Sequence, residues 1–134
     1  MGVRAIADLR EEGSDDPEVL SDHGIQFLHL PVPDHFAPSQ EQLVTGARWV
    51  QHGMRTSRVI VHCKEGVGRS VILACCTLMM DGLDMSQALS LVKSKRRGVA
   101  LNTLQLESVR EFEQWVLGGG RVPSKNAHLA PESA

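Results

Sequence analysis

Hydrophobic residues follow the pattern of β-strands in three short stretches of the chain. In Val3–Leu9 the apolar side chains fall on every second position, and Ile25–Leu30 is a second apolar run that Pro31 and Pro33 should end. The third stretch, Arg58–His62, has a continuous apolar centre, which suits a strand covered on both faces. We therefore expect three strands within the first half of the chain.

Apolar residues at helical spacing, preceded by helix-capping residues, occur between and after these strands. The predicted helices are 17–24, 39–53, 69–80, 84–97 and 101–117. The helix 69–80 is apolar almost all round, so it should be buried against the sheet, whereas the last helix has one stripe formed by Leu104, Val109, Phe112 and Val116. This alternation predicts an α/β fold with a central, mainly parallel β-sheet flanked by α-helices on both faces.

Nine residues, from His62 to Ser70, connect the third strand to the buried helix. A strand that runs through a glycine-bearing loop into a helix N-terminus turns backbone N–H groups and the positive end of the helix dipole toward one small volume. Cys63 begins this loop and Arg69 ends it, so the thiolate should be stabilised and nucleophilic near neutral pH. We expect a phosphate to be bound by Lys64, Glu65, Gly66, Val67, Gly68 and Arg69.

Each residue type in the loop suits this chemistry. Gly66 and Gly68 are expected at positive φ, where the backbone curls its N–H groups inward, and Arg69 offers a planar fork for two phosphoryl oxygens. His62 should order the loop through its ring nitrogens. The Ser70 hydroxyl should hydrogen-bond the cysteine sulfur and help the thiolate to leave, a role that is compatible with capping the helix.

The composition fits one globular domain and narrows the function. The 134 residues include 42% hydrophobic and 22% charged residues with a net charge of −2, which gives no general attraction to nucleic acid or an anionic membrane. The apolar run Val71–Met80 is too short to span a bilayer, and no secretory leader is apparent. The three cysteines suit neither disulfides nor zinc, and Cys75 and Cys76 fit core positions better than a redox role beside the nucleophile. We expect a cytoplasmic protein, because a reducing compartment keeps the nucleophile free.

The motif His62-Cys63-x5-Arg69-Ser70 resembles the signature loop of the cysteine-dependent protein tyrosine phosphatase superfamily, and the short chain resembles its dual-specificity branch. The resemblance runs from Val3 to about Leu117, which implies a catalytic domain over 1–117, followed by a flexible polar tail over 118–134. In that family another segment precedes the first of these strands, so the N-terminus is expected to be abbreviated or to lack the outer strands. No metal or other cofactor is expected.

An acid is needed to protonate the departing oxygen, and Asp34 is the candidate. It lies in a loop that follows a strand, a common location for active-site groups in open α/β folds. It precedes Cys63 by 63 − 34 = 29 residues, and the resemblance implies a mobile aspartate-bearing loop at about that separation. The alternatives are a turn-forming role for Asp34 and an acid role for His35, the weaker candidate.

Two polar residues near the last helix complete the expected site. The resembled family often brings a polar side chain from this turn to the loop, so Asn102 or Gln105 should support the phosphate cradle or the attacking water, unless Asn102 simply caps the helix. The basic cluster Lys93, Lys95, Arg96 and Arg97 either complements the helix dipole or forms a rim that attracts phosphorylated substrates.

The expected reaction is a two-step hydrolysis through a cysteinyl-phosphate, with Asp34 as acid and then base. The chain has no tyrosine, so it lacks the tyrosine-bearing recognition loop of the larger tyrosine-specific enzymes. A shallow pocket should accept phosphotyrosine, phosphoserine or phosphothreonine in a protein, or a small phosphate ester, with neither nucleic acid nor a membrane as partner. The alternatives are a phosphoinositide or an RNA 5′-phosphate as substrate, a rhodanese-like sulfurtransferase, and an inactive phosphate-binding module.

Overall fold

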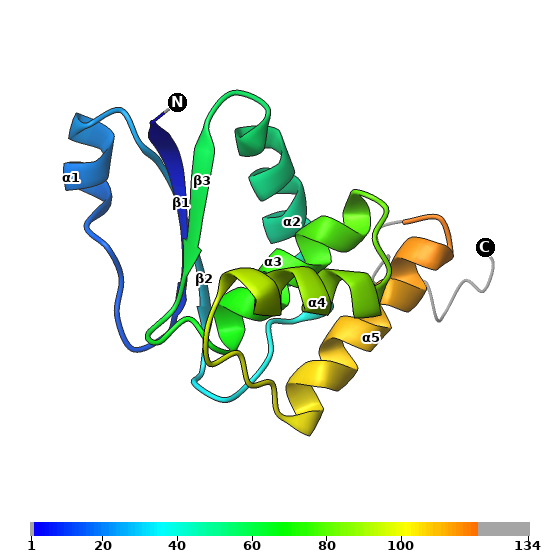
Figure 1. The fold of residues 1–134 in the computed structure, drawn as a ribbon. Helices are drawn as coiled ribbons and strands as arrows, with labels where there is room; N and C mark the ends of the chain where they lie inside the picture. The colour runs from blue at the N-terminus through cyan, green and yellow to red at the C-terminus, as the bar shows by residue number, and fades with distance from the viewer. Residues whose placement is uncertain (1, 121–134) are drawn as a thin grey trace, which may run out of the picture.

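Three parallel strands form the centre of the fold. In this computed structural model, which describes residues 2–120, β1 (Val3–Arg10) lies between β2 (Gln26–Val32) and β3 (Arg58–His62) (Figure 1). Ala7 of β1 pairs with Leu28 on one side and with Val61 on the other. Because all three strands run in the same direction, their carboxyl ends share one edge of the sheet.

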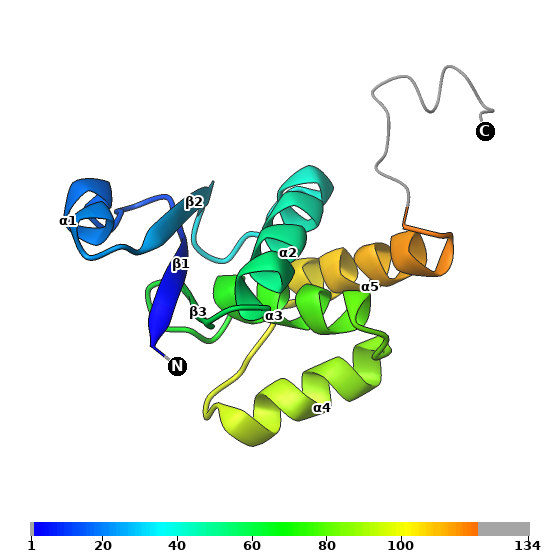
Figure 2. The ribbon, with the colours of Figure 1, turned by 90° about the horizontal axis from the view of Figure 1, so that it is seen from above.

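Helices lie on both sides of this sheet. They are α1 (Pro17–Asp22), α2 (Gln40–Met54), α3 (Arg69–Met80), α4 (Met85–Lys95) and α5 (Thr103–Leu117). The short α1 packs beside β2, whereas α2 and α3 pack on the opposite side, with α4 and α5 against α3 (Figure 2). The predicted α/β architecture with a parallel sheet is thus confirmed.

The hydrophobic core joins the sheet to α2, α3 and α5. Ala7 and Leu9 of β1 belong to the same buried cluster as Ile72, Leu73 and Cys76 of α3, and all of these side chains are fully buried. Burying a leucine or isoleucine side chain contributes roughly 1.5–3 kcal/mol, so α3 is anchored firmly. The helix that begins at the phosphate-loop motif is therefore also the central helix of the core.

Three expectations about individual elements were wrong. Pro31 does not end β2, which continues to Val32, because β2 is an edge strand and a missing N–H is tolerated there. β3 is not covered on both faces: it is the other edge strand, and Ile60 is 42% exposed. Leu104 is half exposed, and Gln105 and Ser108 take buried places on α5 with Val109 and Phe112.

Reciprocal capping boxes define three of the helix starts. Ser39 with Gln42 begins α2, Asp84 with Gln87 begins α4, and Asn102 with Gln105 begins α5. No helix within residues 2–120 has the length and apolar character needed to cross a membrane. The predicted flexible tail lies, from residue 121 onward, outside the described residues.

Candidate active site

The loop from His62 to Ser70 lies at the carboxyl edge of the sheet and leads directly into α3. Gly66 adopts a φ of +71°, and a Cβ at that position would lie 2.2 Å from Nη2 of Arg96. Gly68 was wrongly expected at positive φ: its φ is −130°, and a Cβ there would lie 3.0 Å from the Gln105 amide. Gly66 is thus required for its backbone conformation and its space, whereas a side chain at Gly68 would only crowd the end of Gln105.

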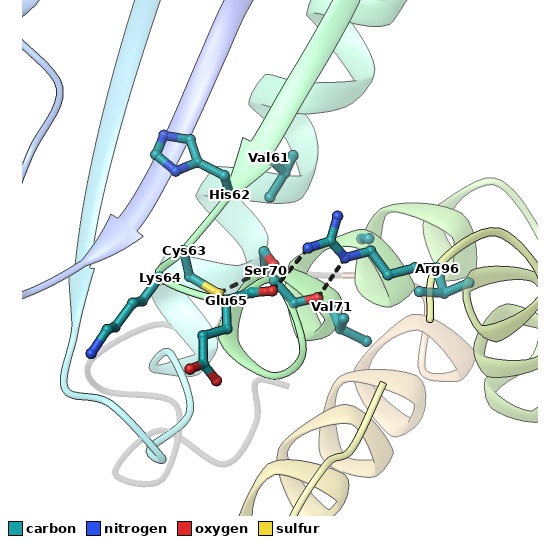
Figure 3. A pocket seen from close by; sticks show the side chains of 11 residues that line it. Val61, His62, Cys63, Lys64, Glu65, Ser70, Val71 and Arg96 are labelled. Carbon is teal, nitrogen blue, oxygen red and sulfur yellow. Dashed lines mark hydrogen bonds between the residues drawn. The ribbon is translucent and has the colours of Figure 1, made fainter. Parts of the chain in front are cut away.

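Three successive carbonyls of the loop are held on its outer side. Arg96 donates from Nη2 to the carbonyl of Glu65 at 2.8 Å and from Nε to that of Gly66 at 3.0 Å, as the close-up shows (Figure 3). The N–H of Ala100 donates to the carbonyl of Val67 at 3.1 Å. Because the N–H and C=O of a trans peptide point in opposite directions, the N–H groups that follow these carbonyls turn to the inner side. The loop is therefore arranged to bind an anion.

Cys63 lies at the base of this loop with only 9% of its surface exposed. Burial alone would raise the pKa of the thiol. The hydrogen bond between Sγ and the Ser70 hydroxyl, 3.3 Å apart, and those from the N–H groups of Ser70 and Gly66 outweigh burial, and the Arg69 cation adds to them, so the pKa is lowered. Ser70 does not cap the helix, because the N-cap position is Gly68 and makes no side-chain capping bond.

Arg69 is almost fully buried, with 2% of its side chain exposed, and its guanidinium is fixed by three hydrogen bonds. Nη1 and Nη2 each donate to one carboxylate oxygen of Glu12 at 2.7 Å, and Nη1 also donates to the carbonyl of Val32 at 2.7 Å. The hydrogen bond to Glu12 raises the pKa of Arg69, and the bond from Arg69 lowers the pKa of Glu12 to about 2. Within residues 2–120, Nε–H and the second Nη2 hydrogen make no hydrogen bond, and they lie along one edge as a fork suited to two phosphoryl oxygens.

Asp34 lies across the same small pocket. Its Oδ1 is 3.5 Å from Nη2 of Arg69, and its side chain is 52% exposed. A pocket of about 60 Å³ is lined by Asp34, His35, Cys63, Lys64, Glu65, Val67, Gly68, Arg69, Ala100 and Gln105. A larger hollow of about 170 Å³ lies between the loop, β3 and α4, and Figure 3 shows its lining. Of these two pockets, the smaller one combines the thiol, the guanidinium and the carboxyl group.

The segment that carries Asp34, residues 33–36, is called the acid loop below. His35 has a φ of +69° and is the only non-glycine residue at positive φ within residues 2–120. This conformation costs roughly 1–2 kcal/mol for a residue with a Cβ. Asn102 donates to the carbonyl of His35 and Gln105 donates to that of Phe36, so both predicted supporting residues bind this loop. Asn102 is also the N-cap of α5.

His62 does not order the loop that follows it. Its ring points away from Cys63 (Figure 3), and Nε2 lies 2.6 Å from a carboxylate oxygen of Asp15. His62, Asp15 and the buried Asp8 bring ligand atoms within 4.8 Å of one another. Arg10 already binds both oxygens of Asp8, so the described contacts explain this cluster without a metal ion. His62 therefore fastens the β1–α1 connection to the end of β3.

Sequence reasoning missed two residues that make important contacts in the site, Glu12 and Arg96. Glu12 lies 57 positions before Arg69, and Arg96 lies 30 positions after Gly66, so no local pattern joins them. A buried arginine demands a carboxylate partner, and the loop after β1 ends at the same sheet edge, which is the one signal for Glu12. The sequence singles out the basic cluster that contains Arg96 but gives no signal for the carbonyl groups that Arg96 binds.

Comparisons with known proteins agree with this geometry. The family described as "Polymorphic toxin system, DSP-PTPase phosphatase" matches residues 1–83. Protein tyrosine phosphatase domain-containing protein 1 of Danio rerio is 28% identical over 102 residues, which are 75% of this chain and 14% of that protein. A probable protein tyrosine phosphatase type IVA B of Dictyostelium discoideum is 34% identical over 65 residues, covering 48% of this chain and 39% of that protein. The chain thus spans well under half the length of these curated relatives.

Solved structures give the same result over more of the chain. Tk-PTP in its active form superposes with a TM-score of 0.78 at 34% identity, covering 84% of this chain and 79% of that one. Human DUSP28, at 21% identity and a TM-score of 0.78, covers 88% and 82% and shares the fold. The chain belongs to the dual-specificity branch of the cysteine-dependent protein tyrosine phosphatase superfamily.

Proposed function

We propose that the chain is a cysteine-dependent phosphatase that hydrolyses phosphoric monoesters on proteins without a metal ion. The observation that carries this proposal is one small pocket lined by a thiol of lowered pKa, an arginine with a free donor edge and a carboxyl group. Family membership supports the same reaction class. The catalytic domain is proposed to end near residue 117.

In the first step, Sγ of Cys63 attacks phosphorus and the bond to the leaving oxygen breaks. The inner N–H groups and the free edge of Arg69 stabilise the equatorial oxygens, while Asp34 gives its proton to the leaving oxygen. In the second step, Asp34 takes a proton from water, which attacks phosphorus and displaces the thiolate. The hydroxyl of Ser70, 3.3 Å from Sγ, stabilises the departing thiolate, and inorganic phosphate is released.

The pocket supports broad choice among phosphorylated side chains. Its volume is only about 60 Å³, and Asp34 at its edge is half exposed, so little of the group beyond the phosphoryl is enclosed. We propose phosphotyrosine, phosphoserine and phosphothreonine in proteins as substrates. A phosphoinositide is the second candidate, since PTPMT1 in complex with PI(5)P shares the fold. The exposed carboxylate of Glu65 in the loop disfavours such a polyanionic lipid.

A reducing compartment such as the cytoplasm fits this chemistry. The Cys63 thiolate is easily oxidised and loses its nucleophilic role once it is.

Steady turnover of p-nitrophenyl phosphate tests the reaction class. We expect hydrolysis that vanadate blocks and that a chelator leaves unchanged, and we expect Cys63→Ser to abolish it. More than trace activity in Cys63→Ser would disprove covalent catalysis. Transfer of sulfur from thiosulfate to cyanide, without phosphate release, would instead support the sulfurtransferase.

A panel of three peptides that differ only in the phosphorylated residue tests the substrate class. We expect phosphate release from all three and slower release from PI(5)P in detergent micelles. Strict selection of the phosphotyrosine peptide, or preference for the lipid, would contradict the proposed specificity.

A further inference from the structure

Two amide side chains at the start of α5 bind the backbone of the acid loop. Nδ2 of Asn102 donates to the carbonyl of His35 at 2.8 Å, and Nε2 of Gln105 donates to the carbonyl of Phe36 at 3.1 Å. The partners are 67 and 69 positions apart in the sequence. The loop that carries Asp34 is thereby joined to a helix from the other end of the described chain.

Each of these amides uses its oxygen and its nitrogen for different purposes. Oδ1 of Asn102 accepts from the N–H of Gln105 at 2.9 Å, and Oε1 of Gln105 accepts from the N–H of Asn102 at 3.1 Å, which completes the capping box of α5. The two NH₂ groups are then free to donate to the acid loop. In α4 the N-cap is Asp84, which caps equally well and has no amide donor.

The position of the bonded carbonyls is informative. One belongs to His35, whose backbone is strained at a φ of +69°. Such a conformation persists only where surrounding contacts hold it. One such contact lies within the loop itself, where the N–H of Phe36 donates to the carbonyl of Pro33 at 3.0 Å. The hydrogen bond from Asn102 thus holds the strained residue itself, which is the neighbour of Asp34 in the chain.

Gln105 also connects the acid loop to the phosphate loop. Its side chain is buried, with 3% exposed, and a Cβ at Gly68 would lie 3.0 Å from its Nε2. The same carboxamide therefore packs on the phosphate loop while it donates to Phe36. Gln105 therefore lies between the acid loop and the phosphate loop and contacts both.

We propose that Asn102 and Gln105 are positioning residues that hold the Asp34 carboxyl over the pocket of Cys63. Both act on the general acid through the backbone of the acid loop, while Gln105 also packs on the phosphate loop. This inference rests on the proposed function, because it requires Asp34 to be the acid.

Asn102→Ser and Asn102→Asp separate this role from helix capping. Both side chains keep an oxygen that caps α5, whereas serine is too short to reach His35 and aspartate has no N–H to donate. Asp84→Ser makes a similar exchange at the N-cap of α4 and serves as the matched control.

The readout is kcat/KM for phenyl phosphate and for p-nitrophenyl phosphate, because this ratio reports the first step, in which the leaving oxygen departs, and not the second step, which both substrates share. Protonation matters more for phenyl phosphate, because its leaving group is the more basic. We expect both Asn102 variants to lower kcat/KM for phenyl phosphate about five- to tenfold and to change kcat/KM for p-nitrophenyl phosphate less than about twofold. Hydrogen exchange of the amides of residues 34–36 should become faster, while Asp84→Ser should change none of these values.

A double-mutant cycle with Asp34→Asn tests whether Asn102 acts through the acid. We expect Asn102→Ser to have no further effect once the acid is gone. An equal loss with and without Asp34 would overturn the inference, and so would unchanged kcat/KM for phenyl phosphate in both Asn102 variants, while the phosphatase assignment would stand. If Asp34→Asn itself leaves kcat/KM for phenyl phosphate unchanged, the acid assignment within the proposed function fails, and this inference fails with it.

Discussion

The phosphate loop and the acid loop face the same pocket but are stabilised in different ways. The phosphate loop is continuous in sequence, and its main side chains, Cys63, Arg69 and Ser70, are buried. The acid loop exposes 52% of the Asp34 side chain and 84% of the His35 side chain, and contacts from distant residues hold its backbone. The part that binds the anion is therefore built into the core, whereas the part that handles the proton depends on a few hydrogen bonds from residues distant in sequence.

The largest effect on turnover is expected at Asp34, the proposed proton donor. Asp34→Asn removes the acid and leaves the buried cradle intact, so turnover of phenyl phosphate should fall roughly 10²–10⁴-fold with KM little changed. The basic limb of the pH–rate profile should disappear. Asp22→Asn, an exposed residue of α1, is the control. An Asp34→Asn enzyme with the wild-type basic limb would exclude Asp34 as the acid.

Two glycine substitutions test how tightly the phosphate loop is built. Gly66→Ala places a methyl group 2.2 Å from Arg96 at a φ of +71°, whereas Gly68→Ala meets the flexible end of Gln105 at 3.0 Å with an ordinary φ. We expect Gly66→Ala to lower kcat/KM by about 10²-fold and Gly68→Ala to lower it several-fold less. Equal losses would mean that Arg96 does not shape the loop. Vanadate affinity, measured alongside, should follow the same order.

Glu12 combines features of both loops, because it lies in an exposed connection and its carboxylate binds Arg69 of the phosphate loop. Glu12→Gln should lower kcat/KM roughly tenfold by loosening Arg69. The pKa of Glu12 is depressed from 4.5 to about 2, so its contribution to stability is complete above about pH 4.5 and is lost as the pH falls toward 2.

Urea denaturation at a series of pH values measures this contribution. The difference in unfolding free energy between the wild type and Glu12→Gln should be constant above pH 4.5 and should shrink toward pH 2. Glu11→Gln, at the adjacent exposed carboxylate, is the control. Parallel curves for wild type and Glu12→Gln down to pH 2 would argue against the ion pair.

The smallest effect is expected at His35 and concerns stability. His35→Gly relieves the positive φ, whereas His35→Ala keeps it, and both lose the same ring. The glycine variant should be more stable than the alanine variant by about 1 kcal/mol in urea denaturation, after glycine's greater freedom in the unfolded chain is allowed for. Greater stability of the alanine variant would show that the strain is absent in solution.

The same contrast explains what the sequence could predict. The phosphate loop and α3 follow from local patterns, because a β-branched run, two glycines and an apolar helix lie next to one another in the chain. Glu12, Arg96 and the role of Asn102 depend on which segments meet in space, and no periodicity encodes that. The errors at Pro31 and Ile60 have the same origin, since a strand's position at the edge of a sheet is decided by its neighbours.

The three cysteines differ in a way that is useful at the bench. Burial raises the pKa of Cys75 to about 11 and also raises the pKa of Cys76, and both side chains are inaccessible, whereas the pKa of Cys63 is lowered. A thiolate-seeking alkylating reagent should therefore label the folded chain once, at Cys63. The number of labels incorporated per molecule, read by mass spectrometry, would report directly what fraction of a preparation is correctly folded and unoxidised.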